Sequence, residues 1–176
     1  MGIFSKKEQV LPFAKTVKVL DKFAKKNGFL VLSNITFSVG DKTFSADNIL
    51  LTKTGAIIFK SYDVRGKLFF NDEKGDWTHI DKDNNKTYIE NPVLVAEKIA
   101  EGVRRIFAKE GVYKTEVEAY SVFVQNSDKK LEIYAPQKLP FLRLSKLAKL
   151  LKSPKCLKDK GISPENMQNA ILKYKV

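Results

Sequence analysis

The segment SADNILLTKTGAIIFKSY, residues 45–62, carries the clearest structural signal in the chain. Two runs of apolar and β-branched residues flank a turn at Lys53-Thr54-Gly55. Runs of this kind, separated by turn residues, are typical of adjacent antiparallel strands. We therefore predict a pair of strands over Thr43–Thr52 and Ala56–Tyr62.

The sequence on either side of this pair predicts a larger sheet. The same pattern recurs several times, with turns such as Gly40-Asp41 between the runs. Short strands at this spacing fit an antiparallel meander, so we expect one central, mainly antiparallel sheet. The further strands expected are Phe29–Val39, Lys67–Phe70, Trp77–Ile80, Val117–Val124 and Leu131–Ala135.

Helices are predicted before, between and after these strands. A proline in the first turn and a glycine or proline beyond the last turn mark their limits. In the first helix, helical spacing predicts a buried stripe of Phe13, Val17, Leu20 and Ala24. The fold class is therefore α+β, or mixed α/β, with helices flanking the sheet. The helices expected are Pro12–Lys26, one from Asn91-Pro92 to Gly111, Ser145–Lys152, and one from Ser163-Pro164.

Length and composition limit the class of protein. The 176 residues suit one domain, 1–176. No apolar run approaches the roughly 20 residues of a membrane helix, and Met1–Lys7 lacks the apolar stretch of a signal peptide. The one cysteine, Cys156, excludes an internal disulfide and a cysteine zinc cluster. We expect no membrane segment and a cytoplasmic location.

The formal charge of +12 is unevenly distributed. Residues 1–46 hold 8 basic and 3 acidic side chains, and residues 136–176 hold 10 and 2. The middle of the chain, 47–135, holds 14 and 15. Positive charge at both ends favours nucleic acid or another anionic surface as the partner. The alternative is that the lysines only keep the protein in solution.

The order of these segments resembles a known family. Residues 45–51 and 55–62 are followed by Gly66, Trp77, the helix opening at Asn91-Pro92, a strand at Tyr120–Gln125 and a leucine-rich basic helix. This order is similar to that of the nuclease-related domain (NERD) family, within the PD-(D/E)xK nuclease superfamily. The resemblance covers 14–152 and implies a restriction-endonuclease-like core, with 153–176 as a C-terminal helical extension.

The resemblance also implies where a catalytic site would lie. In the family, an Asp on the first hairpin strand, a Glu-x-Lys on the next strand and commonly a Glu on the first helix form the site. The carboxylates hold a divalent cation such as magnesium, which activates water. On a strand, residues two apart share a face, so the Glu and the Lys both reach the metal.

This chain departs from that pattern at three of the four positions. The hairpin Asp is Asp47, but the Glu position falls on Lys60, the Lys position on Tyr62 and the helix Glu position at or near Lys15. The formal charge of the set changes from −2 to +1, which is poor for a dication. We therefore expect no catalytic residues and no metal or other cofactor.

Two interpretations of this set stay open. Asp47 and Lys60 can form a cross-strand ion pair, with Tyr62 as a half-buried aromatic residue. Alternatively, the ligands have moved to Asp63, Glu90 or Glu97, and the protein is a divergent nuclease that uses magnesium.

The function expected first is that of a catalytically degenerate nuclease-like domain that binds nucleic-acid backbone, DNA or RNA. The third possibility is a protein-interaction subunit that uses the leucine-rich C-terminal segment. In the short basic helix, lysines every third residue form one edge suited to phosphates. The side chains expected to contact nucleic acid are those of Lys15, Lys18, Lys22, Lys60, Lys146, Lys149 and Lys152.

Overall fold

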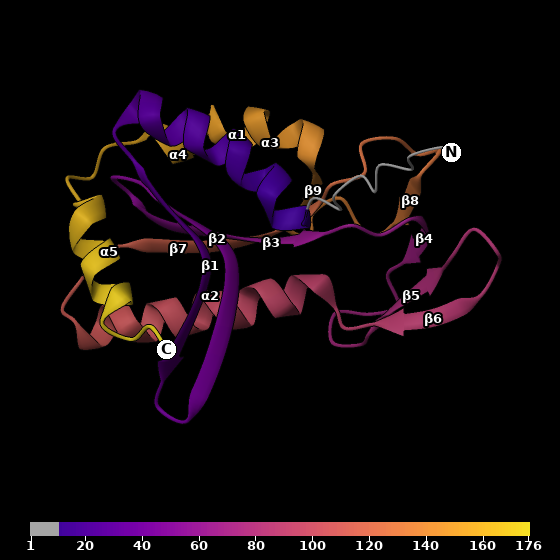
Figure 1. The fold of residues 1–176 in the computed structure, drawn as a ribbon, viewed down its shortest axis with the longest axis horizontal. Coiled ribbons are helices and arrows are strands. Elements are labelled where there is room, and N and C mark those ends of the chain that lie inside the picture. Colours follow the sequence, from indigo (N-terminus) through magenta and orange to yellow (C-terminus); the bar gives the residue numbers. More distant parts are fainter. Residues whose placement is uncertain (1–10) are drawn as a thin grey trace, which may run out of the picture.

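A computed structural model describes residues 11–176; Met1–Lys7, on which the signal-peptide expectation rests, lie outside this range. Figure 1 shows two groups of strands with helices above and below the larger group. The elements in chain order are α1 (Pro12–Asn27), β1 (Leu30–Val39), β2 (Lys42–Leu51), β3 (Gly55–Tyr62), β4 (Gly66–Phe69), β5 (Trp77–Ile80), β6 (Lys86–Ile89), α2 (Pro92–Lys109), β7 (Glu116–Phe123), β8 (Leu131–Tyr134), β9 (Phe141–Arg143), α3 (Leu144–Leu151), α4 (Pro154–Leu157) and α5 (Pro164–Leu172).

The central sheet has the strand order β1-β2-β3-β7-β9. The meander predicted around residues 45–62 is confirmed, because β1, β2 and β3 pair antiparallel. The pairs β3–β7 and β7–β9 are parallel, so the sheet is mixed rather than mainly antiparallel. Parallel neighbours need a crossover connection. The connection from β3 to β7 contains β4, β5, β6 and helix α2. The mixed α+β class is confirmed.

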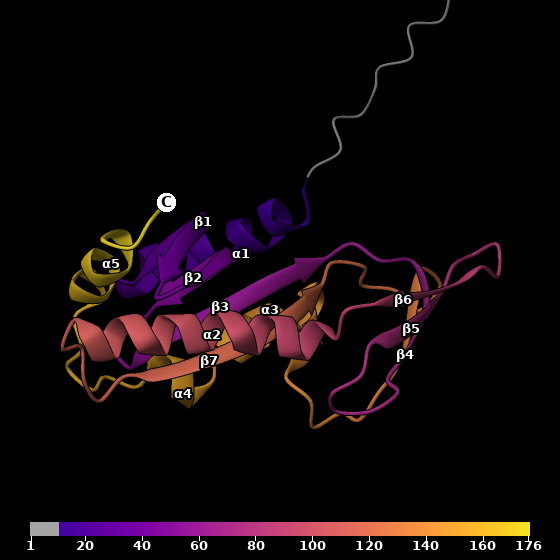
Figure 2. The same ribbon diagram turned by 90° about the horizontal axis from the view of Figure 1, so that it is seen from below.

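A second sheet, with the order β6-β5-β4-β8, was not expected from the sequence. The chain leaves the central sheet after β3 and begins β4 at Gly66. Strand β8 pairs with β4, whereas β7 pairs with β3, so these two consecutive strands belong to different sheets. Figures 1 and 2 both show the small sheet at the end of the molecule opposite α5.

Helices cover both faces of the central sheet. Helices α1 and α3 pack on one face, with Leu20 and Leu147 against Ile57 and Phe59. Helices α2 and α5 pack on the other face in a cluster that contains Ile58 (Figure 1). No helix among residues 11–176 is long and apolar enough to cross a membrane.

The buried stripe of α1 differs from the prediction. Leu20 and Ala24 are buried as expected, but Phe13 and Val17 are only half-buried. Thr16 takes the buried position, where its hydroxyl hydrogen-bonds to Ser61 Oγ at 2.8 Å. The prediction considered only apolar residues, so it chose Val17 for the buried face of the helix and missed its neighbour Thr16.

Gly55 at the start of β3 gives a stability prediction. A Cβ built there would lie 1.8 Å from the carbonyl oxygen of Glu116 on β7. Gly55→Ala must therefore separate β3 from its parallel partner. We expect it to lower the free energy of unfolding by about 3 kcal/mol, at the upper end of overpacking costs. Urea unfolding measures this; a loss under about 0.5 kcal/mol would contradict the close β3–β7 approach.

Candidate functional site

Asp47 lies where the pairing of β2 with β3 ends. The last paired residues are Asn48 and Phe59, so Asp47 faces Lys60 one step further along. Its Oδ1 accepts from Lys60 Nζ at 2.8 Å, and its Oδ2 accepts from the backbone N–H of Ser61 at 2.8 Å. The predicted ion pair is thus confirmed, and both oxygens of Asp47 are already engaged.

The pair is shielded from solvent, with 18% of the Asp47 side chain and 25% of the Lys60 side chain exposed. A charged hydrogen bond in such a place is stronger than one at the surface. A dication would have to displace an ammonium group and compete with a backbone donor for the same carboxylate.

Tyr62 lies on the same face of β3 as Lys60, two residues further along. Its ring packs on Phe123 with the centroids 5.6 Å apart, and the residue is half-buried, as expected. Its hydroxyl is buried without a hydrogen-bond partner in the described structure. Burial, with smaller contributions from Asp47 and Glu90, raises the pKa of this hydroxyl. Tyr62 therefore stays neutral and cannot supply the charge of a catalytic lysine.

Lys15 makes no hydrogen bond or ion pair with this group in the described residues. Side chains alternate along a strand, so Asp47, Lys60 and Tyr62 belong to the face that α2 covers. Helix α1 covers the opposite face, where Leu20 packs against Ile57 and Phe59 of β3 and Thr16 hydrogen-bonds to Ser61. Lys15 has no hydrogen bond or ion pair within residues 11–176. Of the four family positions, Asp47 and Lys60 are bonded to each other and Tyr62 lies on the same face of β3 as Lys60, whereas Lys15 makes no bond to any of them.

The substitute carboxylates have other partners. Asp63 accepts from Gln125 Nε2, Glu90 pairs with Lys98 at 2.7 Å, and Glu97 pairs with Arg104 at 2.6 Å. Among residues 11–176, no three His, Cys, Asp or Glu side chains are grouped so that they could hold a metal ion. The residues present do not fit the magnesium ion that the family's chemistry requires.

The lysines of α1 and α3 come together although they are far apart in sequence. The two helices contact each other on one face of the sheet (Figure 1). Asp21 is the one acid in these two helices. None of their lysines has an ion pair within the described range, and all except half-buried Lys15 are exposed. This α1/α3 lysine layer consists of Lys15, Lys18, Lys22, Lys25, Lys26, Lys146, Lys149 and Lys152.

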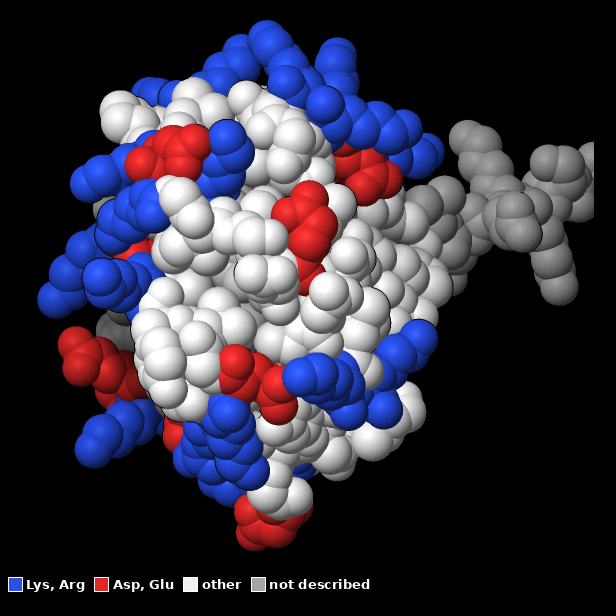
Figure 3. All heavy atoms as spheres, turned by 90° about the vertical axis from the view of Figure 1, so that its left-hand side faces the viewer, with Lys and Arg blue, Asp and Glu red and all other residues white. Residues whose placement is uncertain are grey.

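The layer includes six of the seven side chains expected to contact nucleic acid; the seventh, Lys60, is held by Asp47. Lys25 and Lys26 were missed, although their place in the last turn of the same helix was a usable signal. Figure 3 shows Lys and Arg, in blue, along the upper edge of one end of the molecule, which is the side of α1 and α3 in Figure 1.

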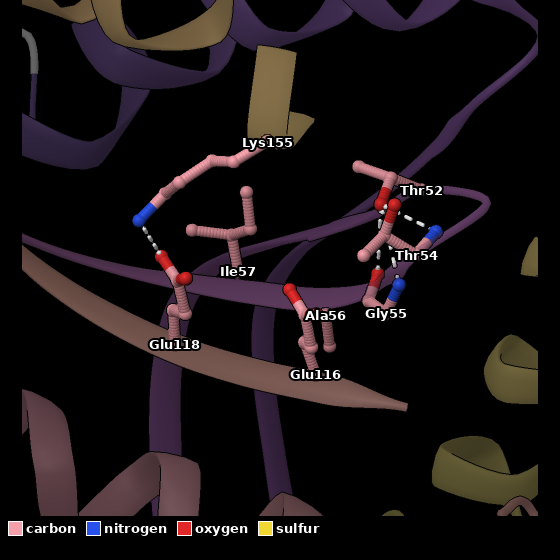
Figure 4. Close-up of a pocket in the computed structure, with 8 residues that line it drawn as sticks. All are labelled: Thr52, Thr54, Gly55, Ala56, Ile57, Glu116, Glu118 and Lys155. Carbon is pink, nitrogen blue, oxygen red and sulfur yellow. Dashed lines mark hydrogen bonds and ion pairs between the residues drawn. The ribbon is translucent and has the colours of Figure 1, made fainter. Parts of the chain in front are cut away.

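Two other features offer no site. Cys156 is buried, and burial raises the pKa of its thiol, so it is not a reactive thiolate. The hollow between the starts of β3 and β7 holds about 10 Å³, room for about one water molecule. There Lys155 is paired with Glu118 (Figure 4).

One of three comparisons with known proteins gave a match. The family model described as the nuclease-related domain matches residues 13–124, well over half of the chain. Comparison with curated proteins and with solved structures gave no match. The matched range ends one residue beyond β7 and includes the Asp47–Lys60 pair.

Proposed function

Because the chain belongs to the nuclease-related domain family, we propose that it binds the nucleic-acid backbone without cutting it. The observation that carries this proposal is the α1/α3 lysine layer. Eight lysines and one acid lie on two neighbouring helices, and the lysines have no partner within residues 11–176. Such a surface attracts phosphates and releases their counterions on binding.

The chemistry of the layer supports contact with the backbone rather than with bases. Lysine is a compact charge that meets phosphate oxygens without reading a base edge. Leu147 and Leu151 point into the core, so lysines and not apolar groups form the outer surface of α3. We therefore propose weak binding that tolerates any sequence.

The Asp47–Lys60 pair supports the absence of cutting. A nuclease of this kind needs carboxylates that are free to hold a metal and a metal that activates water. Here both oxygens of the one remaining carboxylate, Asp47, already accept hydrogen bonds, one from the Lys60 ammonium group and one from the backbone N–H of Ser61. No step of metal-assisted hydrolysis can be assigned to these residues.

The two alternatives are less well supported. A divergent nuclease would need Asp63, Glu90 or Glu97 as ligands, and each is engaged elsewhere. A protein-interaction subunit would need its leucines at the surface. Leu147 and Leu151 are buried, and Leu144 and Leu150 are packed against the same cluster. The exposed leucines of this part of the chain, Leu157 at 44% and Leu172 at 41%, belong to different helices, α4 and α5.

Binding and cutting can be measured on one labelled duplex. In native gels at low salt, the protein is expected to retard the duplex; in denaturing gels, with magnesium or manganese added, the strands should keep their length. The same result is expected for RNA. Asp47→Ala is the control, because cutting that disappears in this variant would show that Asp47 still serves a metal site and would overturn the proposal.

A further inference from the structure

The outward face of the small sheet carries an ordered arrangement that the lysine layer does not explain. Its register places Tyr88 beside Thr78, Thr78 beside Phe69, and Phe69 beside Tyr134. One row of side chains thus crosses all four strands and holds an aromatic residue on three of them. At the usual strand spacing, the outer two, Tyr88 and Tyr134, are about 14 Å apart.

The two tyrosine rings of this row are exposed, whereas Phe69 is half-buried and Thr78 is buried. Tyr88 is 63% exposed and Tyr134 is 48% exposed. Phe69 and Tyr134 stack face to face, with their centroids 4.7 Å apart and their planes within 6° of each other. Each ring therefore covers one face of its neighbour, and a base can stack on the ring face that is turned away from the pair. The opposite face of the sheet holds Leu68, Trp77 and Leu131, which are buried. The apolar core of this part of the molecule is therefore formed by the opposite face, without the outward rings.

Positive charge lies next to this row. The neighbouring row on the same face contains Lys86, Ile80, Lys67 and Glu132. The hollow beside it, of about 350 Å³, is lined by basic side chains without an ion pair in the described structure. Those basic side chains are Arg65, Lys67, Lys82, Lys129 and Lys130.

The acids that line the same hollow are already engaged. Asp81 accepts the backbone N–H groups of Asp83 and Asn85, Asp128 pairs with Arg143, and Glu132 accepts from the Tyr134 hydroxyl. The basic groups are therefore available to an anion from outside.

We infer that this face binds a single strand of nucleic acid, with bases stacked on Tyr88 and on the Phe69–Tyr134 pair and phosphates held by the basic hollow. Four-stranded sheets with exposed aromatic rows bind single strands in this way, because every base has a face that can stack. A duplex is excluded from this mode, since its bases are already stacked and paired. The site is distinct from the α1/α3 lysine layer and does not depend on it.

The test compares two labelled single strands of about 12 nucleotides, oligo(dT) and a strand with the same backbone but no bases. The double variant Tyr88→Ala/Tyr134→Ala should bind oligo(dT) at least about tenfold more weakly than the unmodified protein. Its affinity for the abasic strand should not change. Tyr113→Ala is the control, because Tyr113 is also an exposed tyrosine, 71% accessible, and it lies after α2 and outside this face.

The fold is checked through the fluorescence of Trp77, which lies on the inner face of the same sheet. Unchanged oligo(dT) binding by the double variant would overturn the inference. So would an equal loss on both strands, or unmodified protein that binds both strands equally. Because these variants keep all eight lysines of the α1/α3 layer, a failure here leaves the proposed duplex binding untouched, and the reverse also holds.

Discussion

Replacing Lys146, Lys149 and Lys152 together by Gln is expected to flatten the salt dependence of duplex binding by about two to three units. Each phosphate contact contributes close to −0.9 to the slope of log affinity against log salt. Over a fourfold rise in salt, a difference of about 2.7 corresponds to roughly 40-fold in affinity. All three side chains are exposed, so the fold should remain intact.

The matched control is Lys42→Gln/Lys109→Gln/Lys114→Gln. These lysines are also exposed, but they lie outside α1 and α3. The control changes net charge by the same amount, so it separates a local contact from a general effect of charge. Anisotropy titrations at several salt concentrations give both slopes. Equal flattening by the two triple variants would show that α3 makes no specific contact with phosphates.

Trp77→Ala is expected to cause the largest loss of stability, about 3–5 kcal/mol, because it removes a fully buried large aromatic side chain. Trp77 joins the two sheets. Its ring meets Phe141 of β9 edge-on with the centroids 5.8 Å apart, and it packs near Phe123 of β7. Without it, the apolar cluster between the two sheets loses its largest side chain. Urea unfolding followed by circular dichroism measures the change.

Trp77→Phe is the control for this prediction. The indole Nε1–H is buried without a hydrogen-bond partner in the described structure, and a buried orphan donor costs about 1–3 kcal/mol. Phenylalanine removes that donor while it fills most of the space, so the variant should lose less than half as much stability as Trp77→Ala. If both variants unfold at the same urea concentration, packing between the sheets is not what Trp77 contributes.

The sequence predicted the features that depend on residues close together in the chain, such as turns, strand alternation and helix ends. The turn at 53–55 and the two-residue period of the strands placed Asp47 opposite Lys60, and the ion pair follows from that alone. Asn91-Pro92 and Gly111 predicted the ends of α2 closely, because the helix runs from Pro92 to Lys109. Asn91 caps its start by accepting hydrogen bonds from the backbone N–H groups of Val93 and Leu94.

Contacts between distant segments were not predictable. The parallel pairing of β3 with β7, the three-residue strand β9 and the four-residue helix α4 carry no periodic signal of their own. The aromatic row of the small sheet depends on the strand register. Three of its four strands nevertheless share a local pattern, a charged residue two positions before the aromatic one, as in Lys67–Phe69 and Glu132–Tyr134. That repeat was a signal that local pattern analysis did not use.

The sequence also did not show which face of the central sheet α1 covers. The family pattern implied one site for Lys15, Asp47, Lys60 and Tyr62; Asp47 and Lys60 form an ion pair, whereas Lys15 has no hydrogen bond or ion pair within residues 11–176. The proposed division into a core of 14–152 and an extension of 153–176 stays a prediction. Helix α5 packs in the same apolar cluster as α2, so the extension contributes to the core.

The most direct test of the central claim is the affinity of the unmodified protein for a duplex, measured against salt concentration in the presence of a chelator. Backbone binding by the α1/α3 lysine layer without a metal predicts that log affinity falls linearly with log salt and that the recovered DNA is intact. Absence of binding at low salt, or binding and cutting that begin only when magnesium replaces the chelator, would contradict it.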